Sequence, residues 1–275
     1  MEFVEEMRVI QDSTREDAPL PRRVVLLGAS NLTRGISTVV ETARAMWGHP
    51  LEILAALGHG RSYGQKSTVL IRQLPGIAEC GLWEALASRP AASTAALVAD
   101  IGNDLLYDVP VEVILQWVNR VLEDLKRAQS RTVLILPPLC NLHAVDTWRF
   151  HCLVKVLFPK YRLTPGVLTQ RAQELEQGLR RLAQLHAVNL VAPRPEWYGL
   201  DPIHILSRQY VVAWSEILRY WNDPAPDSGR NLSRSWKRWI QMRSAMPDRY
   251  WLGGIERRNA QPARRFEDGS TLALY

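Results

Sequence analysis

Five short apolar runs, rich in valine, isoleucine, leucine and alanine, recur along the chain and alternate with amphipathic stretches. The runs are 24–29, 51–57, 95–101, 133–136 and 187–191. Most are apolar on consecutive positions, which is typical of strands covered on both faces. The stretches at about 33–47, 111–128, 168–185 and 207–221 have helical spacing. This alternation predicts a parallel sheet with helices on both sides, joined by right-handed crossovers.

Length and composition exclude several classes of protein. The 275 residues suffice for one large domain or two small ones, and 47% hydrophobic with 23% charged residues excludes a disordered chain. No apolar run approaches the length of about 18 residues that a membrane span needs. Acidic residues crowd the N-terminus, which is the wrong charge for a secretory signal, and three cysteines do not make a disulfide framework. We therefore expect a soluble, cytoplasmic protein.

The net charge of +6 is concentrated near the C-terminus. Residues 223–275 hold ten Lys and Arg against six Asp and Glu, which leaves only +2 for the rest of the chain. A nearly balanced body argues against nucleic-acid binding. The pattern predicts an N-terminal extension (1–22), a main domain (23–221) and a basic C-terminal extension (222–275) with Trp236, Trp239, Tyr250 and Trp251.

This C-terminal extension allows two interpretations. Its interleaved arginines and tryptophans could contact a membrane surface, an acidic polymer or a second subunit. We favour an extension packed back over the domain, because so many tryptophans in a free tail would promote aggregation. The sequence does not indicate an oligomeric state.

In open parallel sheets, ligands bind beyond the carboxyl ends of the strands, so functional residues are expected directly after each apolar run. Gly28-Ala29-Ser30-Asn31 follows the first run and leads into a helix. A serine there sits where anionic charge is favoured, although, taken alone, Ser30 or Asn31 is more simply explained as a helix N-cap.

The later loops carry further polar residues. Glycines 58, 60 and 64 follow the second run, Asn103 and Asp104 the third, and Asp201 and His204 the fifth. The glycine spacing matches neither dinucleotide nor P-loop motifs, so nucleotide binding ranks last, and an ordinary turn is an alternative. Asn103 could donate its amide or order a turn. Asp201 could orient the His204 imidazole or form a surface salt bridge.

The conjunction is more informative than any one loop. A serine, a glycine loop, an asparagine and an Asp/His pair follow successive strands, with the fourth strand as the exception, and should converge on one edge of the sheet. Together they supply a nucleophile, a general base, its orienting acid and donors for an oxyanion, which are the parts that acyl transfer needs.

At these residues the chain resembles the SGNH (GDSL) hydrolases over roughly residues 23–220. The four blocks of that family match Gly28-Ala29-Ser30, the Gly60 loop, Asn103-Asp104 and Asp201-Pro202-Ile203-His204. The resemblance implies a three-layer α/β/α sandwich with a mostly parallel five-stranded sheet. It implies Ser30 as nucleophile, His204 as base and Asp201 as its partner, with an oxyanion hole made by the N–H groups of Ser30 and Gly60 and the Asn103 side chain. It implies no metal and no cofactor.

The chain also departs from the family pattern. Ala29 stands where the family usually has aspartate, Asn31 where it has leucine or isoleucine, and Ile101 where glycine is common. None of these positions carries the chemistry. The departures leave the subfamily and the substrate open.

We therefore expect a serine esterase acting on a small-molecule or carbohydrate ester. Gly60-Arg61-Ser62 is similar to the second sequence block of the carbohydrate acetylesterases. Short-chain and acetyl esters are therefore among the candidate substrates. The alternatives are an acyltransferase using the same residues and a catalytically silent binding protein of the same fold.

Several other residues could belong to a site. His59 and Arg61 are weak candidates for substrate contacts, and surface positions are the alternative for both. His143 and His151 match no metal motif, and Cys140 and Cys152 are predicted to be apolar fillers.

Overall fold

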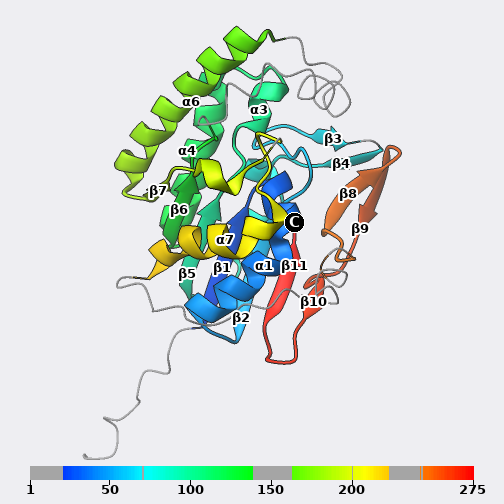
Figure 1. The fold of residues 1–275 in the computed structure, drawn as a ribbon. Helices are drawn as coiled ribbons and strands as arrows, with labels where there is room; N and C mark the ends of the chain where they lie inside the picture. Colours follow the sequence, from blue (N-terminus) through cyan, green and yellow to red (C-terminus); the bar gives the residue numbers. More distant parts are fainter. Residues whose placement is uncertain (1–20, 70, 139–162, 200, 223–241, 243) are drawn as a thin grey trace, which may run out of the picture.

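The computed structural model describes residues 21–69, 71–138, 163–199, 201–222, 242 and 244–275 (Figure 1). Positions 1–20, Cys140, His143, His151, Cys152, Trp236 and Trp239 lie outside these residues. Seven strands form the central sheet in the order β10-β11-β2-β1-β5-β6-β7, and only β10 runs antiparallel to its neighbour. The strands are β1 (Arg22–Leu27), β2 (Leu51–Ala56), β5 (Ser93–Val98), β6 (Arg131–Ile135), β7 (Asn189–Val191), β10 (Arg264–Arg265) and β11 (Thr271–Leu274).

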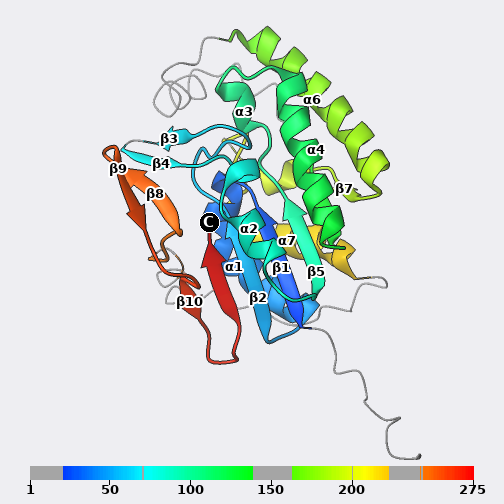
Figure 2. The same cartoon turned by 180° about the vertical axis from the view of Figure 1, so that it is seen from behind.

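Helices cover both faces of this sheet, as Figures 1 and 2 show from opposite sides. They are α1 (Ser30–Trp47), α2 (Leu82–Ala87), α3 (Asn103–Leu106), α4 (Val111–Arg127), α6 (Pro165–His186) and α7 (Tyr210–Leu218). Short 3-10 turns occupy Ile77–Glu79, Pro195–Trp197, Ser207–Gln209 and Arg219–Trp221. Val24 and Leu26 pack with α1 and α7, whereas Val25 and Leu27 pack with α2, α4 and α6. Consecutive strand residues are thus buried on opposite faces, which explains the unbroken apolar runs.

Helix α6 begins and ends at residues that can cap a helix. Thr164 accepts a hydrogen bond from the Val167 N–H at the start of α6, Pro165 occupies its first turn, and Ala187 ends it in the left-handed conformation. The apolar stripe of α4, which includes Ile114, is buried along its length.

The predicted fold class is confirmed: the described chain forms a three-layer α/β/α sandwich, and its five predicted strands are β1, β2, β5, β6 and β7. The number of strands was underestimated, because the C-terminal segment adds β10 and β11. In the register of that edge, Leu272 lies opposite Ile53. The four residues of β11 are too few to stand out as an apolar run, and their partner strand is more than 200 positions away.

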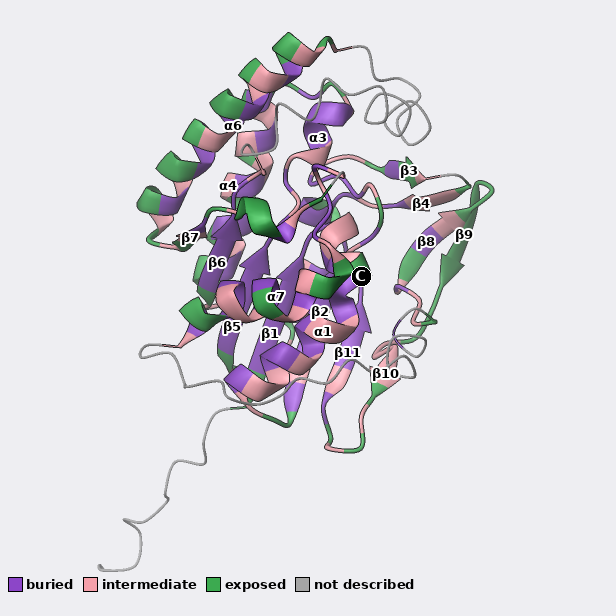
Figure 3. Ribbon diagram, in the orientation of Figure 1, coloured by how far each residue is buried: buried purple, intermediate pink, exposed green. Residues whose placement is uncertain are grey.

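A second, smaller antiparallel sheet lies beside the sandwich. Its order is β3-β4-β8-β9, with β3 at Ser67–Val69, β4 at Arg72–Leu74, β8 at Arg249–Leu252 and β9 at Ile255–Arg258. Figure 3 shows β9 exposed along its length and the central strands buried. Among the described helices, none is both long and apolar enough to cross a membrane.

Candidate active site

The loops at the carboxyl edge of the sheet bring the predicted polar residues together. Ser30 is the first residue of α1, two residues after the turn at Gly28, whose N–H donates to Ala56 O over 3.1 Å. Asn103 opens α3 after β5, and His204 lies between β7 and α7. A side chain at Gly28 would crowd Leu32 and the Asp100 carboxylate at 3.2–3.3 Å, so glycine suits this turn.

Ser30, His204 and Asp201 form a continuous hydrogen-bonded chain. His204 Nε2 lies 2.9 Å from Ser30 Oγ, and His204 Nδ1 lies 2.6 Å from Asp201 Oδ2. With the proton on Nδ1, the imidazole donates to the carboxylate and its Nε2 accepts from the serine hydroxyl. His204 is 5% exposed, so this contact lies largely below the surface.

Asp201 is held as a carboxylate. Burial works to raise its pKa, but the hydrogen bond and charge of His204, the Ile203 N–H and Arg34 together lower the pKa below its ordinary value. The backbone N–H groups of Ile203 and His204 donate to Asp201 Oδ1 over 3.1 and 3.3 Å. The anion is therefore present at neutral pH, where it can stabilise a protonated His204.

Asn103, which lines the same pocket as Ser30, carries a donor that has no partner in the described part of the chain. Asn103 Nδ2 is buried, and among the described residues it has no hydrogen-bond partner. Within the same part of the chain, no hydrogen bond is found for the N–H groups of Ser30 and Gly60. A buried donor without a partner is costly, so such an amide is typical of a site that receives an acceptor from a ligand.

The Gly60 loop has a conformation that glycine favours. Gly60 has a φ of +61°, in the left-handed region, and its carbonyl accepts from Tyr107 Oη over 2.6 Å. The tyrosine therefore restrains the peptide group between Gly60 and Arg61.

Asp100 is a functional residue that the sequence analysis did not assign. Its Oδ2 accepts from the N–H groups of Ala29, Asn31 and Leu32 at 2.7, 3.1 and 3.2 Å. A carboxylate at the start of α1 accepts from the free N–H groups of the first turn, and its negative charge is stabilised by the helix dipole. Asp100 thus fixes the turn that presents Ser30, in a chain whose own position 29 is alanine. The available signal was its place as the one polar residue in the run 95–101.

Asn31, one of the departures from the family pattern, joins the two sides of the site. Its Nδ2 donates to Asp100 Oδ1 and to Ile203 O, both over 2.8 Å, and its Oδ1 accepts from the Ile205 N–H over 2.8 Å. The last two contacts lie immediately before and after His204. One amide therefore positions His204 relative to the helix that carries Ser30.

Asp104 holds the glycine loop. It is fully buried, and it accepts from Ser62 Oγ and, over 2.9 Å, from the Tyr63 N–H. Burial raises the pKa of Asp104 to about 6, although both hydrogen bonds work to lower it. This carboxylate connects the Asn103 loop to the loop of Gly60.

The two weak candidates for substrate contacts lie elsewhere. Arg61 is fully buried, and its guanidinium donates to the carbonyl oxygens of Pro75, Leu57 and Tyr275. Its side chain therefore does not face the pocket beside Ser30, contrary to the expectation of a substrate contact. His59 lines a different cavity, between the central sheet and the small sheet.

Metal ligands are not gathered within the described ranges, where no cluster of three or more His, Cys, Asp or Glu side chains could hold an ion. Cys80 is buried as a free thiol.

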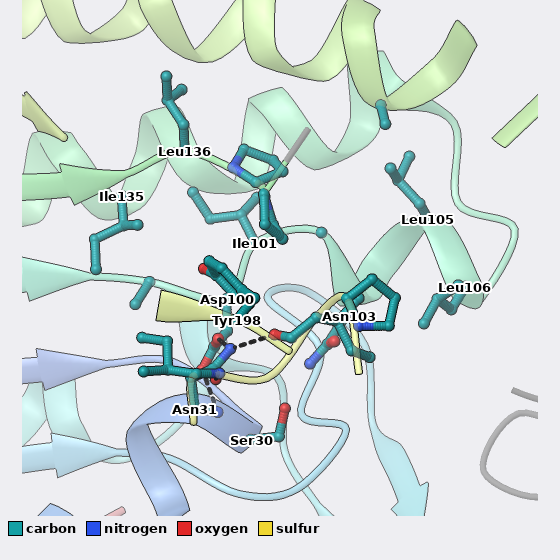
Figure 4. A pocket seen from close by; sticks show the side chains of 18 of the residues that line it. Ser30, Asn31, Asp100, Ile101, Asn103, Leu105, Leu106, Ile135, Leu136 and Tyr198 are labelled. Carbon is teal, nitrogen blue, oxygen red and sulfur yellow. Dashed lines mark hydrogen bonds between the residues drawn. The ribbon is translucent and has the colours of Figure 1, made fainter. Parts of the chain in front are cut away.

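Ser30 and Asn103 open onto a pocket whose other walls are mainly apolar (Figure 4). The pocket is formed by the loop after β5, the end of β6, α3, the first half of α6 and the segment around Ile203. The figure places Ser30 at one end, with Ile101, Leu105 and Leu136 across the cavity from it.

No family model and no curated protein matches the sequence. Solved structures do resemble the chain. The psychrotrophic esterase EstA from Pseudoalteromonas sp. is 10% identical, over 73% of this chain and 98% of that one, with a TM-score of 0.47. A carbohydrate acetylesterase family member from Sinorhizobium meliloti is 14% identical, over 72% and 95%, also with a TM-score of 0.47. The M. smegmatis aryl esterase is 13% identical, over 71% and 95%, with a TM-score of 0.45.

These three proteins are esterases by name. At such identities and TM-scores, the likeness carries no argument about the reaction. What this chain can catalyse has to be inferred from its own side chains.

Proposed function

We propose that the chain is a serine esterase that hydrolyses carboxylic esters through an acyl-enzyme on Ser30. The observation that carries the proposal is the Ser30–His204–Asp201 chain of hydrogen bonds beside the unpartnered amide of Asn103. A capping serine needs no buried imidazole on its hydroxyl and no orphan donor next to it.

In the first half of the reaction, Ser30 Oγ attacks the ester carbonyl carbon while His204 Nε2 takes the hydroxyl proton. The carbonyl oxygen becomes an oxyanion, which the Asn103 amide and the N–H groups of Ser30 and Gly60 stabilise. The bond between the former carbonyl carbon and the alkoxy oxygen then breaks. Protonated His204 gives its proton to that oxygen, and the alcohol leaves.

In the second half, water replaces the alcohol. His204 takes a proton from the water, whose oxygen attacks the acyl carbon, and the bond to Ser30 Oγ breaks as His204 returns the proton to the serine. The acid leaves and the enzyme is regenerated. An acyltransferase would differ only in using an alcohol in place of this water.

Labelling with a fluorophosphonate tests the proposal without knowledge of the substrate. We expect the label on Ser30 in the wild type and its loss in Ser30→Ala and His204→Ala, with ester hydrolysis falling by about 10⁶ on the scale of other serine hydrolases. Ser88→Ala is the matched control, because Ser88 is an exposed serine at the end of α2. A folded wild type that neither takes the label nor hydrolyses esters would refute the proposal and favour a binding protein.

A further inference from the structure

The pocket beside Ser30 has walls of hydrocarbon almost throughout. Its apolar lining comes from four regions of the fold and includes Ile101, Leu105, Leu106, Leu136, Leu168 and Ala172. Each of these six side chains is at most 6% exposed. The polar residues Asn31 and Asp100 also contribute to the wall, but they are hydrogen-bonded to each other. A sugar in this space would lose water from its hydroxyl groups without gaining partners, which is unfavourable.

The pocket lies on the acyl side of the ester rather than the alcohol side. The general acid has to reach the oxygen of the leaving alcohol, and that acid is His204. The His204 ring does not line the pocket, although its neighbours Ile203 and Ile205 do, whereas Ser30 and Asn103 line it directly. With the carbonyl carbon at Ser30 and its oxygen at Asn103, the alcohol departs toward His204 and the acyl chain extends into the pocket.

The pocket is also larger than an acetyl group requires. Its volume is about 120 Å³, several times the roughly 10–15 Å³ that one water molecule needs by the same measure. The methyl group of an acetyl ester would leave most of the apolar wall uncovered.

We propose that this pocket binds an apolar acyl chain longer than acetyl, and hexanoyl is the chain used to test it. The inference rests on the proposed function, since it names the substrate class of the same site. It changes the expectation from the sequence, where the Gly60-Arg61-Ser62 block pointed toward acetyl esters of carbohydrates.

A series of p-nitrophenyl esters tests the proposal, because acetyl, butyryl and hexanoyl esters share one leaving group. Burying one methylene corresponds to about a fourfold gain, so we expect kcat/KM to rise more than about a hundredfold from acetyl to hexanoyl. The gain should also appear in the rate at which Ser30 is labelled by alkyl fluorophosphonates of increasing chain length, which involves no turnover.

Two pocket variants and one control make the test specific. Ala172→Phe fills the pocket from α6 and should lower the hexanoyl-to-acetyl ratio of kcat/KM at least tenfold. Gln173→Phe places the same ring on the exposed face of α6 and should leave that ratio unchanged. Leu168→Ala enlarges the pocket and should move the preference toward octanoyl, which keeps the test open if Ala172→Phe does not fold.

The outcomes separate the two proposals. If Ser30 takes the label but acetyl esters are hydrolysed as well as hexanoyl esters, the acyl pocket is refuted and the esterase stands. If the ratio is unaffected in both folded pocket variants, the pocket is likewise refuted. If Ser30 takes no label and no ester is hydrolysed, both proposals fail together.

Discussion

The loop after β5 and the segment that carries the base lie on either side of Ser30 and are held in different ways. Asp100 and Asp104, four positions apart, fix the start of α1 and the glycine loop by hydrogen bonds to backbone N–H groups. The Asp201 side chain, by contrast, is 36% exposed. Besides the hydrogen bond between His204 and Ser30, the segment around His204 is tied to α1 through the side chain of Asn31.

This difference indicates a division of labour. Ser30 and the glycine loop are positioned by the partly buried Asp100 and the buried Asp104, which are also part of the fold, so replacing either carboxylate should affect stability as well as rate. The base is positioned by an amide and a half-exposed carboxylate, so changes there should affect the rate and leave the fold largely intact.

Replacing Asn103 should produce the largest effect of the three changes considered. Asn103→Ala removes an oxyanion donor, and we expect kcat for ester hydrolysis to fall by about 10²–10³ with little change in KM. The unfolding temperature should not drop, because no described residue bonds to the Nδ2 that is lost. Steady-state kinetics would check this, with Asn189→Ala, an exposed asparagine on β7, as control. A near-normal kcat would refute the role of Asn103 but not the triad.

The charge of Asp104 allows a test of whether the loop after β5 contributes to the stability of the fold. Burial raises the pKa of Asp104 to about 6 from 3.8 in an unfolded chain, so the folded state binds the proton more tightly. The stabilisation by the protonated form is complete below pH 4 and is lost as the pH rises through 6. Relative to Asp104→Asn, which does not titrate, the wild type should lose up to about 3 kcal/mol of unfolding free energy over that interval.

Urea unfolding of both proteins at several pH values between 4 and 7 would measure this difference. A flat difference would show that burial does not shift the pKa of Asp104. A wild type that gains stability with rising pH would show that the hydrogen bonds from Ser62 and Tyr63 outweigh burial.

Much of the site was predictable, since the order of Ser30, Asn103, Asp201 and His204 and the rule about carboxyl ends of parallel strands suffice to bring them together. The parts that were missed depend on partners remote in sequence. Asp100 receives N–H groups about 70 positions away, and nothing local marks it beyond an interruption in an apolar run.

Arg61 was misjudged for a related reason. Its acceptors are backbone carbonyl oxygens, including that of Tyr275, 214 positions away, and a sequence does not reveal which carbonyls a fold leaves open. Strands β8 to β11 were not predicted, because each has only two to four residues. Their stability comes from tertiary partners rather than from an apolar pattern within the strand.

Asn31 should give the smallest effect and the sharpest test of the comparison. Asn31→Leu restores a residue that the SGNH pattern prefers while removing the three hydrogen bonds that connect α1 to the base segment and to Asp100. We expect kcat per fluorophosphonate-labelled site to fall about tenfold, on the order of one net hydrogen bond in the transition state, with KM unchanged. A purely structural role would instead lower the number of labelled sites and the unfolding temperature while leaving kcat per site intact. Asn119→Leu, which removes a half-buried amide on α4 that bonds to Glu123 and His186, serves as control. If Asn31→Leu matches that control in kcat per site, the base does not depend on Asn31, and the contrast between the two sides of Ser30 loses its basis.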